Sequence, residues 1–230
     1  MKKIFSLLLL LLVVSSASSQ ILISLLLGDK LNSEGIEFGL EGGLNGAKIS
    51  GMETNASRSA LNLGFYFDIQ MKEQFWLHTG FLAVTTFGTD KLTENDLNFL
   101  DATIYSEKGD YNQTLNYFVL PVLAKYKFKN HFYVEAGPQF GMAYRPYVEF
   151  LESNDKFDAR IREYNMDKIN RLDAGIRAGI GYKLLHGKGM NIGIAYYYGF
   201  ANVYKDRSGT KNQSFFIVTD IPIGRAKEPK

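Results

Sequence analysis

Apolar and polar residues alternate one by one along several segments of the chain. From Phe118 to Phe128 every second residue is apolar, while Lys125 and Lys127 fall between them. The alternation restarts at Phe132 and continues to Arg145. A period of two is the signature of a β-strand whose two faces lie in different surroundings. These segments are therefore predicted to be strands with one apolar and one polar face.

The same period marks six further segments, so that about eight strands are predicted in all. They are 36–45, 61–71 and 172–184, with weaker patterns at 74–87, 189–203 and 212–223. The charged faces are also the faces that hold many of the glycines. A small soluble barrel packs its apolar face inward, whereas a transmembrane barrel turns that face to lipid and fills its narrow interior with charged or small residues. The pattern favours an all-β fold, a transmembrane up-and-down antiparallel β-barrel.

The N-terminus has the pattern of a cleaved signal peptide. Lys2 and Lys3 precede an apolar run at 4–14, and small residues follow up to Ser19. An uncleaved anchor is the alternative, but spanning a bilayer needs about 20 apolar residues. Cleavage after Ser19 and export to the bacterial outer membrane are expected. The predicted division is a signal peptide at 1–19, a periplasmic segment at 20–35, the barrel at 36–224 and a C-terminal tail at 225–230.

The connections between the predicted strands differ in length. Those at 72–73, 129–131 and 185–188 are short, whereas those at 88–112 and 146–168 are long and rich in charge. Outer-membrane barrels have short periplasmic turns and longer outer loops, so the two long connections are expected outside the cell. Aromatic girdles are expected at both ends. Their predicted members are Phe75, Trp76, Phe128, Phe132 and Tyr182 at the periplasmic end, and Phe87, Tyr144, Tyr147, Tyr198 and Phe200 at the outer end.

Composition excludes several classes of function. The chain has 26 Lys and Arg against 24 Asp and Glu, and the excess comes from Lys2 and Lys3 alone, so that nothing favours nucleic acid as a partner. The absence of Cys removes disulfides, thiol catalysis and thiolate metal sites. No cofactor, metal site or catalytic residue is predicted. The three histidines, His78, His131 and His186, are expected to be solvated residues in or near periplasmic turns.

The charged residues on the predicted inner faces form the sharpest candidate site. Isolated buried charges are very unfavourable, so these residues are expected to pair inside the barrel and to plug it. A polar conduction path is the alternative, although the interior of an eight-stranded barrel is just filled by side chains. The predicted lumen charge network consists of Glu37, Glu41, Asp68, Lys125, Glu135, Arg145, Arg171, Asp173, Arg177 and Lys183.

Several segments resemble the PorT-like outer-membrane β-barrel proteins of Bacteroidetes. They are ILISLLLGDKLNS at 21–33, IEFGLEGGLN at 36–45, LNYFVLPVLAKYKF at 115–128 and FYVEAGPQFG at 132–141. The resemblance covers nearly the whole chain after the signal peptide. It implies an outer-membrane barrel and carries no catalytic motif.

The expected function is therefore structural or interactive rather than enzymatic. The long outer loops are the expected surface for a protein partner. Outer-membrane lipid and lipopolysaccharide, and the barrel-assembly machinery during insertion, are the other expected partners. A small-solute porin or a transport or secretion accessory barrel is the alternative, and a barrel enzyme is a third.

Overall fold

The computed structural model describes residues 31–33, 35–152 and 160–223. The predicted signal peptide, most of the predicted periplasmic segment and the C-terminal tail lie outside these residues. The strands are β1 (Ile36–Ile49), β2 (Ala56–Lys72), β3 (Phe75–Asp90), β4 (Gly109–Lys127), β5 (Phe132–Glu152), β6 (Arg160–Tyr164), β7 (Leu172–Lys183), β8 (Asn191–Gly199) and β9 (Asn212–Pro222). Two short helical segments are α3 (Glu94–Leu100) and α4 (Leu184–Gly187). Among the residues described, no helix has the length and apolar character needed to cross a membrane.

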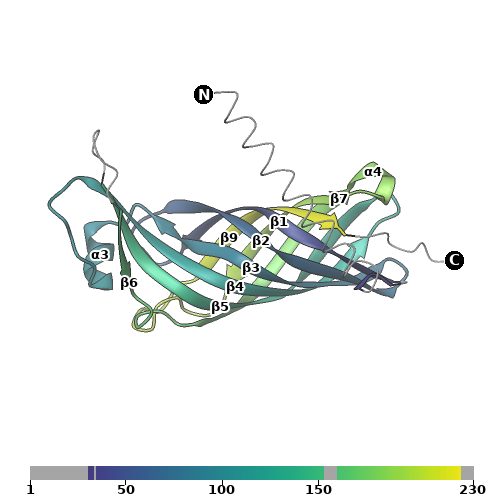
Figure 1. Cartoon of the computed structure of the whole chain (residues 1–230). Helices are drawn as coiled ribbons and strands as arrows, with labels where there is room; N and C mark the ends of the chain where they lie inside the picture. The colour runs from purple at the N-terminus through teal and green to yellow at the C-terminus, as the bar shows by residue number, and fades with distance from the viewer. Residues whose placement is uncertain (1–30, 34, 153–159, 224–230) are drawn as a thin grey trace, which may run out of the picture.

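Eight of these strands close into a barrel. The order around the ring is β4-β3-β2-β1-β9-β8-β7-β5, and a pairing between β4 and β5 completes it. All the pairings are antiparallel. Apart from the pairing of β1 with β9, each barrel strand pairs with the barrel strands before and after it in the sequence. Figure 1 shows the barrel lengthwise, with α3 at one end and α4 at the other. The predicted up-and-down barrel of about eight strands is confirmed.

The ninth strand, β6, belongs to an extension beyond the barrel wall. β7 pairs with the first half of β5, from Phe132 to Met142, whereas β6 pairs with the second half, from Tyr147 to Leu151. Part of the connection predicted as a loop at 146–168 is therefore a β-hairpin. The end of the barrel that carries this hairpin and α3 also carries the long connections. We call it the outer end, and the opposite end the periplasmic end, after the orientation expected from the loop lengths.

Along much of the barrel wall the two faces of the strands have the predicted surroundings. In β8, for example, Ile192, Ile194 and Tyr196 are exposed, and the residues between them are buried. Other strongly exposed apolar side chains on the outer wall are Leu61, Leu63, Phe75, Phe132, Phe140, Leu172, Ile176 and Ile180. The barrel therefore turns its apolar face outward, which is the arrangement of a barrel that contacts lipid.

Several register shifts interrupt the barrel strands. A β-bulge changes which residues face inward, because an extra residue reverses the alternation beyond it. Between β4 and β5, Tyr117 pairs with Ala143 but Asn116 pairs with Arg145, so Tyr144 is the extra residue. Arg145 is consequently exposed on the outer wall, and the prediction that it faces the lumen is wrong. In β3 a register shift between Leu82 and Thr85 has a similar effect.

The outer half of the interior is filled with aromatic and aliphatic side chains. Phe87 lies inside the barrel with its ring centroid 5.7 Å from that of Tyr197 and 5.3 Å from that of Tyr117. Phe216 packs edge-on against the same ring. Phe87 and Tyr147 are buried, so their predicted exposure in the outer girdle is wrong.

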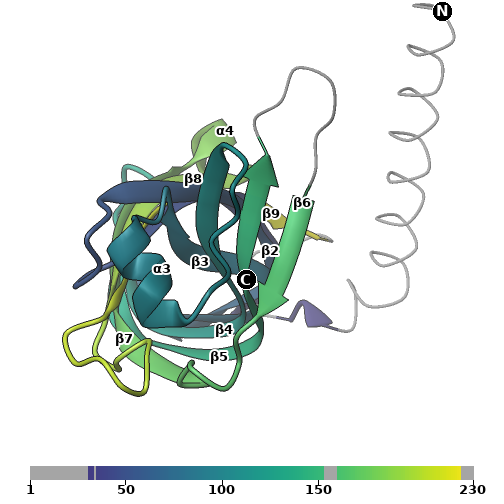
Figure 2. The same ribbon diagram turned by 90° about the vertical axis from the view of Figure 1, so that its left-hand side faces the viewer.

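Helix α3 lies over the outer mouth of the barrel, as the end-on view in Figure 2 shows. It begins with a capping box between Thr93 and Asp96. Leu97 and Leu100 are buried and belong to the same hydrophobic cluster as the aromatic residues below them. The outer mouth is therefore closed by packed apolar side chains.

Candidate functional site

A cluster of charged side chains fills the periplasmic half of the interior. Its carboxylates are Glu37, Glu41, Asp68, Glu135 and Asp220, and its cationic groups are Lys125, Lys127, Arg177, Lys183 and His78. We call these ten residues the lumen cluster. The five carboxylates face four Lys and Arg side chains and one histidine. The cluster is electrically balanced when His78 is protonated.

Lys125 of β4 is the centre of the lumen cluster. Its Nζ lies 3.3 Å from Asp68, 3.4 Å from Glu135 and 3.6 Å from Asp220, and the side chain has no exposed area. The ammonium also lies 4.3 Å from the centroid of the Tyr133 ring. One cation therefore contacts carboxylates from three other strands.

Glycines on β7 and β8 leave the space that Tyr133 occupies. A Cβ at Gly181 would lie 2.3 Å from the phenol oxygen of Tyr133, and one at Gly193 would lie 2.6 Å from it. The inward glycines of these two strands therefore determine where the ring beside Lys125 can sit.

Arg177 of β7 is the second fully buried cation. Its Nη2 lies 3.1 Å from Glu41 and 3.9 Å from Glu135. The guanidinium carbon lies 5.2 Å from the centroid of Phe216, at the border with the aromatic layer. A buried charge requires such partners, because leaving it unpaired costs several kcal/mol.

His78 of β3 is buried between two carboxylates, so the prediction of a solvated histidine is wrong for this residue. Its Nδ1 lies 2.7 Å from Asp68, which is directly opposite it in the register of β2 and β3. Its Nε2 lies 3.4 Å from Glu41. His131 and His186 lie beside the periplasmic turns, where their rings are 6.4 Å apart.

The periplasmic mouth carries the remaining members of the lumen cluster. Lys183 and Glu37 form an ion pair, and the hydroxyl of Tyr66 donates to Glu37 at 3.0 Å. Lys127 lies 2.7 Å from Asp68 and 3.6 Å from the centroid of Trp76. Trp76 is therefore half-buried against a lysine rather than fully exposed in a girdle.

The structure gathers seven of the ten residues predicted for the lumen network. They are Glu37, Glu41, Asp68, Lys125, Glu135, Arg177 and Lys183. Asp173 faces inward but lies apart, where it accepts a hydrogen bond from Asn212 at 2.8 Å. Arg145 and Arg171 are exposed. Arg145 is turned outward by the bulge, and Arg171 lies just outside β7, so the alternation of that strand does not determine its direction. The prediction missed His78, Lys127 and Asp220.

Some ion pairs of the lumen cluster join neighbouring strands, as Lys125 and Glu135 do, and others cross the barrel. β4 and β9 stand four places apart in a ring of eight, yet Lys125 contacts Asp220. β7 and β1 are separated by two strands, yet Arg177 contacts Glu41. Side chains from opposite walls therefore meet in the middle of the interior.

This arrangement is suited to holding the walls of the barrel together. Each cation of the lumen cluster is engaged by a carboxylate of the same cluster. Within the described ranges, no group of three or more His, Cys, Asp or Glu side chains is placed to bind a metal ion.

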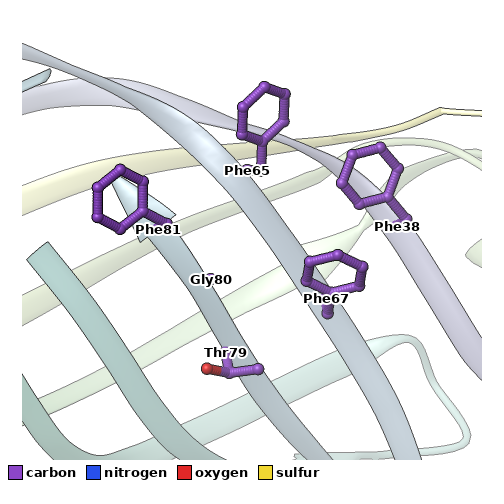
Figure 3. A pocket seen from close by; sticks show the side chains of 6 residues that line it. All are labelled: Phe38, Phe65, Phe67, Thr79, Gly80 and Phe81. Atoms are coloured by element: carbon purple, nitrogen blue, oxygen red, sulfur yellow. The ribbon is translucent and has the colours of Figure 1, made fainter. Parts of the chain in front are cut away.

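An apolar hollow of about 420 Å³ lies on the outer wall of β1, β2 and β3. Figure 3 shows the rings of Phe38, Phe65, Phe67 and Phe81 around it. The Phe38 and Phe65 rings are stacked with centroids 5.8 Å apart. None of the described residues that line the hollow is titratable.

Comparison with known protein families gives a sequence match over most of the chain. Residues 24–205 match the family described as "Outer membrane protein beta-barrel domain". No curated protein matches the sequence.

Solved structures of low sequence identity are similar to this chain. Ail, the attachment invasion locus protein of Yersinia pestis, in complex with the heparin analogue sucrose octasulfate, is 12% identical with a TM-score of 0.47, covering 83% of this chain and 99% of that one. Neisserial surface protein A is 9% identical with a TM-score of 0.42, and the match covers 82% of this chain and 99% of that protein. OprG from Pseudomonas aeruginosa is 14% identical with a TM-score of 0.34, and the match covers 83% of this chain and 95% of that protein.

Proposed function

Because this chain belongs to the family of outer membrane protein β-barrel domains, we propose that it is a closed, non-conducting barrel with a structural or interactive role. The observation that carries the proposal is the contact between Lys125 and Asp220, whose strands lie on opposite walls. A conducting barrel needs a continuous polar path, and here the lumen cluster is followed by an apolar layer under α3. Both halves of the interior support closure.

The extension at the outer end supports an interactive role. The segment that follows α3 is held on the β5–β6 hairpin, because the amide of Thr103 and the hydroxyl of Tyr105 both donate to Glu163, at 3.1 and 3.0 Å. Burial raises the pKa of Glu163, but these hydrogen bonds outweigh it and hold the pKa below its usual range. The Tyr105 ring stacks on Phe150 at 4.9 Å. An ordered surface of this kind is available to a partner outside the cell.

Other parts of the proposal rest on the sequence. The charged, apolar and small regions of residues 1–19 support a cleaved signal peptide. The segments at 115–128 and 132–141 support a PorT-like protein of a bacteroidete. The barrel-assembly machinery is the proposed partner during insertion, and no enzymatic activity is proposed.

Conductance measurements test the proposed closure. The purified, folded barrel, reconstituted in planar bilayers, should show no steady ion current above that of the protein-free bilayer. An established open porin reconstituted in the same way provides the positive control. A steady current with a defined single-channel size would contradict the proposal and would favour a small-solute pore.

A further inference from the structure

A group of arginines lies on the outward face of the β5–β6 hairpin. Directly opposed residues of an antiparallel pair point to the same face. Tyr147 is opposite Tyr164, Glu149 is opposite Arg162, and Leu151 is opposite Arg160. Arg145 lies two residues before Tyr147 and is exposed. We call Arg145, Arg160 and Arg162, together with the rings of Tyr147 and Tyr164, the arginine patch.

The side chains of the arginine patch are ordered by contacts with one another. The guanidinium of Arg162 lies 4.8 Å from the centroid of Tyr147, and that of Arg145 lies 6.0 Å from the centroid of Tyr164. The two tyrosine rings meet edge-on at 5.8 Å. Stacking of this kind reduces the freedom that an arginine loses when it binds a ligand.

Glu149 anchors two of the three arginines. Its Oε1 lies 2.8 Å from Nε of Arg162 and 3.4 Å from Nε of Arg160. Glu149 is itself almost fully buried, whereas the side chains of Arg160 and Arg162 are 57% and 40% exposed. The carboxylate therefore fixes the guanidinium groups without covering them.

The arginine patch keeps an excess of positive charge. Arg58 also approaches Glu149, at 4.0 Å, and forms an ion pair with Asp90 at 2.6 Å. Among the described residues, this network therefore contains four arginines, Arg145 included, and two carboxylates. Arg171 adds a further exposed cation nearby, since its carbonyl accepts a hydrogen bond from the amide of Ala143. Within the part of the chain that the structure describes, the network therefore has two more positive than negative charges.

The position of the arginine patch along β5 indicates what kind of anion balances its excess positive charge. The outward residues of β5 are apolar or aromatic from Phe132 to Tyr144, and Arg145 follows immediately. Twelve residues of a strand tilted as in such barrels rise about 30 Å, close to the height of the apolar band of an outer-membrane barrel. The arginine patch therefore lies just above the upper edge of the hydrocarbon layer, at the level of lipid headgroups.

We propose that the arginine patch binds the phosphate groups of a phosphorylated glycolipid headgroup in the outer leaflet. Guanidinium groups match phosphate through paired hydrogen bonds, and exposed tyrosines are favoured at the membrane interface. Tyr164 and Tyr144, both exposed, flank the arginines at this level. The proposal rests on the proposed function only in requiring that the barrel spans the outer membrane with α3 outside.

Lipid binding by the full-length, folded protein in detergent tests this proposal. The probes are lipid A with two phosphates, the same lipid A without phosphates, and inorganic phosphate. Lipid A with phosphates should bind, and the double variant Arg145→Gln/Arg162→Gln should weaken that binding about 30-fold, as expected for two cations near a charged membrane surface. The matched control Lys108→Gln/Lys205→Gln removes two exposed charges at the outer end and should change the affinity less than threefold.

A heat-modifiability gel checks that each variant is folded, independently of lipid binding. If the glutamine variant does not fold, Arg145→Lys/Arg162→Lys keeps the charges and should still weaken binding severalfold, because ammonium groups lack the paired geometry. Equal binding of lipid A without phosphates would overturn the proposal. An equal loss of affinity in the control variant Lys108→Gln/Lys205→Gln would also overturn it. Inorganic phosphate that binds as tightly as the lipid would assign the patch to a free anion instead. None of these outcomes changes the expected absence of conductance.

Discussion

Replacing Arg177 with alanine should lower the free energy of unfolding of the barrel by about 3 to 5 kcal/mol, a range measured in soluble proteins for one lost partner of a buried ion pair. Arg177 has no exposed area and contacts Glu41 and Glu135. Without it, both carboxylates lose a cation that water cannot replace in a packed interior. Urea unfolding of the barrel in lipid vesicles, followed by tryptophan fluorescence, measures the change.

Arg171→Ala provides the matched control for Arg177→Ala. Arg171 is also an arginine near the start of β7, but its side chain is exposed. Its removal should change the unfolding free energy by less than about 0.5 kcal/mol, as is usual for surface substitutions. Similar losses in the two variants would contradict the assignment of Arg177 to a buried ion-pair network.

Replacing Lys125 with methionine should destabilise the barrel by a similar amount, and the loss should depend on pH. Methionine has nearly the volume of lysine but no charge, so Asp68, Glu135 and Asp220 would all lose their shared cation. Their mutual repulsion is present at pH 7 and decreases when the carboxylates are protonated. The variant should therefore be closer to the unmutated protein at pH 4 than at pH 7.

The double variant Lys125→Met/Asp220→Asn separates charge from packing. Removing one of the uncompensated carboxylates should recover part of the stability at pH 7, since the two residues are 3.6 Å apart and are coupled. Equal losses at both pH values, together with no recovery in the double variant, would show that packing rather than charge explains the effect.

The barrel could be predicted from the sequence because its outer wall needs large apolar residues at every second position. The alternation in Phe118–Phe128 and in Phe132–Tyr144 survives in the structure as the lipid-facing wall. The bulge at Tyr144 could not be predicted in this way, since Tyr144 and Arg145 continue the apolar-polar alternation across it. The side-chain pattern stays regular while the backbone reverses its faces, so the alternation alone predicts the wrong side for Arg145.

The members of the lumen cluster were harder to predict than the strands. His78 and Asp220 are single polar residues in segments that alternate only weakly. Their inward direction follows from residues on the same face, such as Trp76 and Phe216, whose own orientation is known only from the structure. Which charges pair depends on how the ring closes, because partners such as Lys125 and Asp220 come from opposite walls. Strand periodicity carries no information on that closure.

Tryptophan quenching can show whether the apolar outer face of the barrel contacts lipid. The only tryptophan, Trp76, is replaced by phenylalanine, and Phe140→Trp then places a single indole on the outer wall of β5, where Phe140 is exposed. In bilayers with brominated acyl chains this indole should be strongly quenched, and aqueous iodide should have little effect. Lys108→Trp in the same background should behave in the opposite way. If iodide quenches the indole at position 140 and brominated lipid does not, the outer wall faces water rather than lipid, which would contradict a membrane-spanning barrel.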